Sequence, residues 1–267
     1  MHPIAFEFGP LTIYWYGVLV GLGCLAGLWT ASRRGLLDGF PPDTVYDVGL
    51  WVLIGTVIGA RALHVISYWD QEFAGRPWIA ILNLRQGGLV FYGGFLGAAA
   101  GVLLFCAFKK EPLWRIADML APSTALGSVF GRIGCLMTGC CYGSTCTLPW
   151  AIHFPTDHAT HGSPVHPSQI YDSLTNLAVY GVLEWAYRRK RFDGQIFAGW
   201  LLIYPLARSI TELFRGDYAL SERFVGGLTP AQLLSVGIFM AGLILYWKLP
   251  RRLGGRGPAG SSAGRDA

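Results

Sequence analysis

Three arginines lie inside apolar runs that are long enough to cross a membrane. They are Arg61, Arg132 and Arg208, and Glu212 is the one acid at hand, four residues after Arg208. A charged side chain inside a span costs about 2.5–3.5 kcal/mol on insertion scales, so such residues usually face a protein interior or a wet cavity. Arginine binds phosphate through paired N–H donors. The excess of positive charge therefore favours a site for an anion.

A second candidate for chemistry is the stretch "SVFGRIGCLMTGCCYGSTC", which begins at Ser128. It places Cys135, Cys140, Cys141 and Cys146 within twelve residues. The spacing lacks the C-x2-C pairs of structural zinc sites and the C-x-x-C-H of haem attachment, so we predict no metal site and no cofactor. An external position allows one disulfide. A membrane thiol–disulfide oxidoreductase that uses these cysteines stays open as an alternative.

The elements that position these residues are predicted to be membrane helices. The chain has 267 residues, of which 52% are hydrophobic and only 14% charged, against about 25% charged in soluble domains. Its mean hydropathy is +0.41. The net charge of +5 comes from short basic clusters between apolar runs, which indicate topology rather than nucleic acid as a partner.

We predict an all-α, polytopic bundle of about seven transmembrane helices. The expected spans are residues 14–32, 45–68, 88–108, 116–136, 168–187, 194–214 and 228–247. They form one transmembrane catalytic domain, residues 1–249, and residues 250–267 form a disordered cytoplasmic tail. The basic pair Arg33–Arg34 follows the first apolar run instead of preceding it, so we expect a retained first span and no cleaved signal peptide.

The basic residues also predict the orientation of the bundle. The segments after the first, third, fifth and seventh spans hold 14 of the 21 lysines and arginines, and the opposite side holds four. Because cytoplasmic loops are enriched in lysine and arginine, the N-terminus is expected outside and the C-terminus in the cytoplasm.

This orientation brings the unusual polar residues of six spans to one depth, near the outer leaflet. They are Tyr14, Tyr16, Arg61, His64, Tyr92, Arg132, His166, Ser168, Gln169, Tyr171, Asp172, Arg208, Glu212 and Arg215. A single arginine near a helix end can extend to the headgroups, and Arg208 and Glu212 can pair with each other. Their gathering at one depth instead favours a functional cavity, and the obvious anion at this face is a lipid phosphate.

Several motifs resemble those of the prolipoprotein diacylglyceryl transferases, over residues 14 to about 247. They are "YWYG" at 14–17, "GGLVFYGGFLG" at 87–97, "GRIGC" with "GCCYG" at 131–143, "HPSQIYD" at 166–172 and "ARSITELFRGD" at 207–217. The resemblance implies an enzyme of the bacterial inner membrane whose active site faces the outer leaflet. It would move the diacylglyceryl group of phosphatidylglycerol to the lipobox cysteine of a prelipoprotein signal peptide. The products would be a thioether and glycerol phosphate, with no cofactor.

The gathering of the arginines and the resemblance together give the candidate roles. The catalytic candidates are Tyr92, His166, Arg208 and Glu212, and the substrate-binding candidates are Tyr16, Arg61, Arg132, Gly143 and Arg215.

The chain departs from the family's signature, G-R-x-G-N-F-x-N-x-E-x-x-G, at three polar positions. Cys135, Thr138 and Cys140 stand there, and Tyr92 stands where relatives often have a histidine proposed as the base. A paralogous lipid transferase with a different acceptor is therefore a further alternative.

Overall fold

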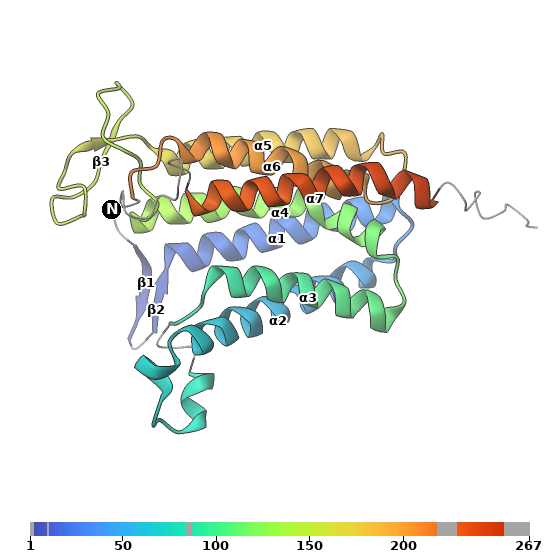
Figure 1. The fold of residues 1–267 in the computed structure, drawn as a ribbon. Helices are drawn as coiled ribbons and strands as arrows, with labels where there is room; N and C mark the ends of the chain where they lie inside the picture. The colour runs from blue at the N-terminus through green and yellow to red at the C-terminus, as the bar shows by residue number, and fades with distance from the viewer. Residues whose placement is uncertain (1–2, 10, 84–86, 218–228, 254–267) are drawn as a thin grey trace, which may run out of the picture. The chain divides into compact units, whose positions relative to one another are not determined.

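Seven α-helices dominate the computed structural model, which describes residues 3–9, 11–83, 87–217 and 229–253 (Figure 1). The helices are α1 (Trp15–Leu37), α2 (Pro42–Ser67), α3 (Phe91–Lys109), α4 (Leu113–Thr138), α5 (Ser168–Tyr187), α6 (Gln195–Glu212) and α7 (Pro230–Leu253). The short elements are β1 (Ile4–Phe8) paired with β2 (Leu11–Tyr14), the helical turns η1 (Trp69–Phe73) and η2 (Trp78–Leu82), and β3 (Ile152–His153) paired with β4 (Pro164–Val165). The predicted helical fold class is confirmed, and the two hairpins are additions that the sequence analysis did not predict.

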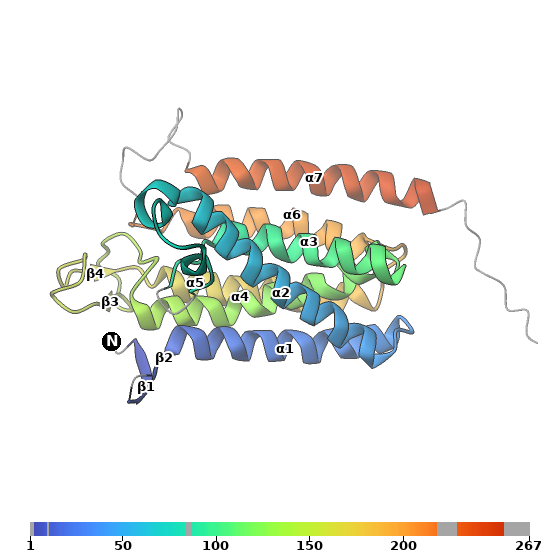
Figure 2. The ribbon, with the colours of Figure 1, turned by 90° about the horizontal axis from the view of Figure 1, so that it is seen from below.

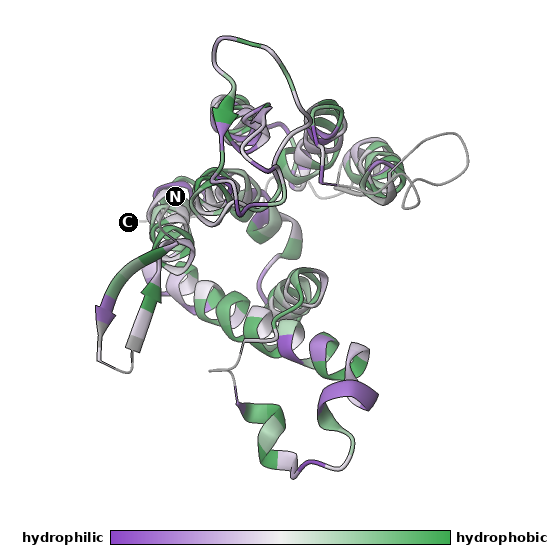
Figure 3. Cartoon of the chain, turned by 90° about the vertical axis from the view of Figure 1, so that its left-hand side faces the viewer, coloured by the Kyte–Doolittle hydropathy of each residue, from purple (hydrophilic) through white to green (hydrophobic). Residues whose placement is uncertain are grey.

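The composition of the helices is that of a membrane protein. Among the described residues, α1, α2, α3 and the part of α7 over Ala231–Pro250 are each long and apolar enough to span a bilayer. Helices α4 and α6 carry Arg132, Arg208 and Glu212 of the predicted site, and the number of seven spans stays a prediction. Between α2 and α3, Figure 3 shows a hydrophilic turn, η1, followed by a hydrophobic one, η2.

Contacts divide the chain into two compact units, Met1–Gly27 with Ala117–Ala267, and Leu28–Ile116. In the first unit, α7 lies along α6 in both Figures 1 and 2. The buried core of this unit consists of residues from α4, α5 and α6. They are Ala121, Ala125, Val179, Leu183, Tyr187, Ile196 and Trp200. The single domain over residues 1–249 stays a prediction. Helix α7 continues to Leu253, and the rest of the predicted tail lies outside the described residues.

The second unit is built on a close contact between glycines of α2 and α3. A Cβ atom on Gly97 of α3 would lie 2.0 Å from the carbonyl oxygen of Gly55, and one on Gly59 of α2 would lie 2.3 Å from the carbonyl oxygen of Gly93. Gly55 and Gly59 are four residues apart in α2, and Gly93 and Gly97 are four residues apart in α3. The two glycines of each helix therefore lie on one face of it. Small residues at this spacing allow membrane helices to pack backbone against backbone.

Arg61 of α2 determines where α3 begins. Its Nε donates to the carbonyl of Ile81 at 2.7 Å, and its Nη1 donates to those of Gly87 and Gly88 at 2.9 and 3.1 Å. Its Nη2 donates to two further carbonyls of the same loop. Both glycines have a φ of +81°, which is outside the helical region. Helix α3 therefore starts at Phe91, three residues after the predicted start of the span.

In the first unit, a buried carboxylate fixes the start of α6. Asp118 of α4 is fully buried, and it accepts hydrogen bonds from the backbone N–H groups of Gly194 and Phe197, both at 2.9 Å. Lys190 Nζ lies 3.7 Å from the same carboxylate. The first N–H groups of a helix have no partner within the helix, and a carboxylate satisfies them while complementing the helix dipole. Asp118 is thus the N-terminal cap of α6.

The glycine contact predicts a position that tolerates no side chain. Gly97→Ala should lower the free energy of unfolding by about 1–3 kcal/mol, because the added methyl group meets backbone that cannot rotate away. The measurement is thermal unfolding of the purified chain in detergent. Gly181→Ala in α5 is the matched control, since its Cβ has nothing within 4 Å and alanine favours the helix. Equal melting temperatures for Gly97→Ala and the unsubstituted chain would contradict the close contact.

Candidate functional site

One carboxylate connects three helices of the first unit. Asp172, in the second turn of α5, lies with its Oδ2 3.2 Å from Arg132 Nε of α4 and 3.7 Å from Arg208 Nη1 of α6. Asp172 is 4% exposed, so both contacts form largely out of water. A buried charge is tolerated when it is paired, and here one acid pairs with two arginines. The predicted convergence of Arg132 and Arg208 is therefore present, through a residue that the sequence analysis did not assign to the site.

A second carboxylate organises the end of α6. Glu212 forms an ion pair with Arg208 Nη2 one turn earlier, and Arg215 Nη1 lies 3.7 Å from the same oxygen. Its other oxygen accepts a hydrogen bond from Thr229 Oγ1 at 3.0 Å. Arg215 also donates to both carboxylate oxygens of Asp217, at 2.8 and 2.5 Å. Glu212 thus holds Arg208 and Arg215 in fixed positions.

These contacts change the expected charge of the site. The sequence analysis placed one acid beside the arginines, but Asp172 and Asp217 also pair with them. Within the described part of the chain, the cluster thus contains Arg132, Arg208 and Arg215 against three carboxylates. Arg132 is the most accessible of the three arginines. Its side chain is 21% exposed, whereas that of Arg208 is 11% and that of Arg215 is 9% exposed. Arg132 is therefore the arginine of this cluster that solvent reaches most easily.

Gly143 lies where three segments of backbone meet. It pairs with Arg215 in an isolated antiparallel bridge, and the N–H of Ser144 donates to the carbonyl of Phe214 at 2.9 Å. A Cβ on Gly143 would lie 2.3 Å from the carbonyl oxygen of His166, so only glycine fits. This residue ties the segment after α4 to the end of α6 and to the segment before α5.

His166 is part of a small aromatic group at the same end of the unit. Its Nδ1 lies 3.4 Å from the hydroxyl of Tyr171, which accepts a hydrogen bond from Trp150 Nε1 at 2.7 Å. Its ring centroid is 5.3 Å from that of Phe214, which follows α6. His166 is partly exposed, so a group that gives up a proton could reach its ring.

The next two polar residues of the "HPSQIYD" motif hold the turn after α4. Ser168 Oγ donates to the carbonyl of Cys141 at 2.7 Å, and Gln169 Nε2 donates to that of Cys140 at 2.8 Å. Both side chains are buried. The motif thereby joins the start of α5 to the segment that follows Arg132.

Tyr16 packs in the same unit, at the start of α1. A Cβ on Gly134 of α4 would lie 2.9 Å from its ring, so the absence of a side chain at Gly134 makes room for the tyrosine. Tyr16 is still 43% exposed, which leaves much of its ring accessible to a lipid.

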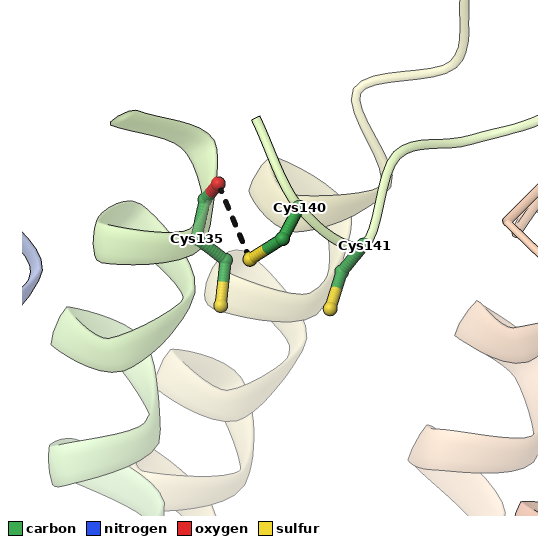
Figure 4. Close-up of side chains that lie close together, drawn as sticks. All are labelled: Cys135, Cys140 and Cys141. Atoms are coloured by element: carbon green, nitrogen blue, oxygen red, sulfur yellow. Dashed lines mark hydrogen bonds between the residues drawn. The ribbon is translucent and has the colours of Figure 1, made fainter. Parts of the chain in front are cut away.

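The turn after α4 gathers three of the four signature cysteines (Figure 4). The Sγ atoms of Cys135, Cys140 and Cys141 all lie within 4.8 Å of one another. All six cysteines are free thiols in the structure, so the disulfide allowed by the sequence is not formed. Hydrogen bonds from Cys135 and Cys141 lower the pKa of the Cys140 thiol. Spacing alone did not predict this convergence, because it arises from the shape of the turn.

The two remaining candidates lie in the second unit. Tyr92 is the second residue of α3; its side chain is exposed and packs edge-on against Phe91, with the ring centroids 5.9 Å apart. Arg61 uses its five N–H groups on backbone carbonyls, as described above, so its observed role is to hold the loop that leads to Tyr92. Direct contact of Arg61 with a substrate stays a prediction.

Comparison with known proteins covers nearly the whole chain. The family model for prolipoprotein diacylglyceryl transferase matches residues 3–248. A phosphatidylglycerol–prolipoprotein diacylglyceryl transferase of Finegoldia magna is 32% identical over 254 residues, which cover 95% of this chain and 98% of that protein. One of Solidesulfovibrio magneticus is 36% identical over 256 residues, 94% of each chain. One of Legionella pneumophila strain Corby is 33% identical over 254 residues, 92% of this chain and 96% of that protein. These matches support neither a thiol–disulfide oxidoreductase nor a transferase with another acceptor.

The shared carboxylate makes a prediction about stability. Asp172→Asn should lower the free energy of unfolding by about 2 kcal/mol, because it leaves two largely buried arginines without their common counter-charge. Thermal unfolding in detergent measures the effect. Asp157→Asn is the control, since Asp157 is an exposed aspartate between α4 and α5 and its replacement should change stability by less than about 0.5 kcal/mol. If the two variants unfold at the same temperature, Asp172 does not hold the helices together.

Proposed function

Because the chain belongs to the prolipoprotein diacylglyceryl transferase family, we propose that it transfers the diacylglyceryl group of phosphatidylglycerol to the lipobox cysteine of prelipoproteins. This transfer is the first step of bacterial lipoprotein maturation. The observation that carries the proposal is the family match over residues 3–248, which includes every candidate site residue.

The proposed location is the bacterial inner membrane, with the site toward the outer leaflet. The distribution of lysine and arginine between alternate loops supports an external N-terminus and a cytoplasmic C-terminus. In this orientation, the arginine cluster lies at the depth of a lipid phosphate. Phosphatidylglycerol would enter from the bilayer, and the lipobox cysteine would arrive as part of a membrane-bound signal peptide.

The reaction forms one bond and breaks one. The sulfur of the lipobox cysteine attacks the glycerol carbon that carries the phosphate ester, and a thioether C–S bond forms. The C–O bond to phosphate breaks, and glycerol phosphate leaves with the electron pair. A free cysteine has a pKa of about 8.5, so a base that accepts the thiol proton increases the rate.

Arg132 and Arg208 are the proposed partners of the phosphate. Negative charge grows on the phosphate oxygens as the C–O bond breaks, and fixed cations stabilise it best when they need no reorganisation. Both arginines already share Asp172, so a phosphate oxygen takes over part of the role of that carboxylate. Glu212 keeps Arg208 and Arg215 oriented during this exchange.

Two residues are candidates for the base. Tyr92 occupies the position of the histidine that relatives often have there, but a neutral phenol is a poorer base than an imidazole. Its alternative role is to donate a hydrogen bond to the phosphate. His166 has a side chain suited to proton transfer near neutral pH. Tyr16 is proposed to line the lipid pocket, and Gly143 lets the backbone approach the headgroup closely.

The arginines provide the test of this function. The purified chain should transfer labelled diacylglyceryl from phosphatidylglycerol to a lipobox peptide, and Arg132→Ala and Arg208→Ala should each lower kcat/KM by about 100-fold, as loss of one donor to a developing charge does. Arg188→Ala, an exposed arginine at the end of α5, should retain full activity. A chain without any transfer would contradict the function, whereas an active chain with unaffected arginine variants would contradict only the phosphate site.

Tyr92→Phe separates the hydroxyl of Tyr92 from its ring. If the hydroxyl serves as the base or as a donor to phosphate, the rate of transfer should fall at least about 100-fold, the low end of about 10²–10⁴ for general acid–base catalysis. The ring contact with Phe91 should persist, so protein levels should not change. Tyr46→Phe, in the first turns of α2, is the matched control. Unchanged transfer by Tyr92→Phe would leave His166 as the base.

A further inference from the structure

The end of α4 brings two cysteine side chains together by its backbone conformation. The N–H of Gly139 donates to the carbonyl of Leu136, and the N–H of Cys140 donates to that of Cys135. Gly139 has a φ of +79°. This is the Schellman arrangement of a helix end. Cys135 lies in the last helical turn, and Cys140 lies just past the glycine. The two side chains in these positions contact each other, and here both are thiols.

A third thiol joins them through a backbone conformation that residues other than glycine seldom adopt. Cys141 has a φ of +59°, and this conformation costs free energy unless the surroundings hold it. Hydrogen bonds fix the carbonyls of the whole turn. Gln169 binds that of Cys140, Ser168 binds that of Cys141, and His158 Nε2 lies 2.9 Å from that of Gly139. The convergence of the three sulfurs is therefore built into the fold.

We propose that Cys135, Cys140 and Cys141 bind one thiophilic metal ion, Cu(I) or Zn(II), through three thiolates. Soft sulfur ligands select these ions over hard cations such as Mg²⁺. A metal–sulfur distance of about 2.3 Å places three sulfurs about 4.0 Å apart around the ion, so sulfurs that already lie within 4.8 Å need only small side-chain rotations. Cu(I) is saturated by three sulfurs, and Zn(II) would keep water in a fourth position.

The surroundings of the three sulfurs suit a bound ion. Cys140 is exposed, which gives the ion an entry path, and Cys135 and Cys141 are partly buried. The hydroxyl of Thr138 lies 3.3 Å from Cys140 Sγ, where it can donate to a thiolate and orient it. Binding exchanges thiol protons for the metal ion, so each thiol that binds releases its proton and no electron is transferred. The proposed transfer reaction requires no metal, and the three thiols are neighbours of its site, because Arg132 and Tyr16 both interact electrostatically with Cys135 and Cys141.

Metal competition tests the proposal in the full-length chain. The protein is purified in detergent under reductant, stripped with a chelator, and titrated with Cu(I) in one arm and Zn(II) in the other, each against a coloured competing chelator. We expect one equivalent to bind in at least one arm, and a rise in melting temperature on binding. Cys135→Ser, Cys140→Ser and Cys141→Ser should each weaken binding at least tenfold.

Cys146→Ser is the matched control, because Cys146 belongs to the same segment but not to the three-sulfur cluster, and it should bind as the unsubstituted chain does. Two results would overturn the proposal: no competitive binding of either ion, and binding that survives replacement of all three cysteines by serine. If the reduced chain binds no metal, a count of four free thiols without reductant would mean that two of the sulfurs form a disulfide instead.

Discussion

Burial of like charges between helices is the constraint on which the described structure of the first unit depends. Arg132 and Arg208 come from different helices, and both must leave bulk water to lie where they do. One carboxylate, that of Asp172, contacts both and makes their proximity possible. Without it, repulsion and desolvation would oppose the packing of α4 against α6 at this end. In the proposed reaction, the same arrangement would keep two cations ready for a phosphate that partly replaces the carboxylate.

Hydrogen bonds from side chains to backbone carbonyls hold the segments around the site. Arg61 fixes the loop before α3, and Ser168 and Gln169 fix the turn after α4. Backbone outside helices carries polar groups that cannot remain unpaired in a membrane protein. These side chains satisfy the carbonyls and define the loop conformations at the same time. Polar residues that look catalytic in a sequence thus also serve as supports.

The sequence allowed prediction of the helices, because hydropathy follows from single residues, and the depth at which the polar residues lie stays a prediction. It could not show that Arg61 binds carbonyls or that Asp172 joins two arginines, since partners distant in sequence depend on packing. The convergence of Cys135 and Cys140 had a local signal that spacing rules for zinc sites do not include. Two cysteines five residues apart around a helix-ending glycine lie side by side in a Schellman turn.

The cap that Asp118 provides has a consequence for the opposite end of α6. An α-helix rises about 1.5 Å per residue, so Arg208, one turn after Pro205, lies about 20 Å along α6 from the capped start at Gly194. Because the carboxylate holds the first turn, it also sets the axial position and rotation of every later residue of α6. A slip of one residue at the cap would turn Arg208 by about 100° away from Asp172. The buried acid at the start of α6 thus acts as a reference point for the geometry of the arginines at its end.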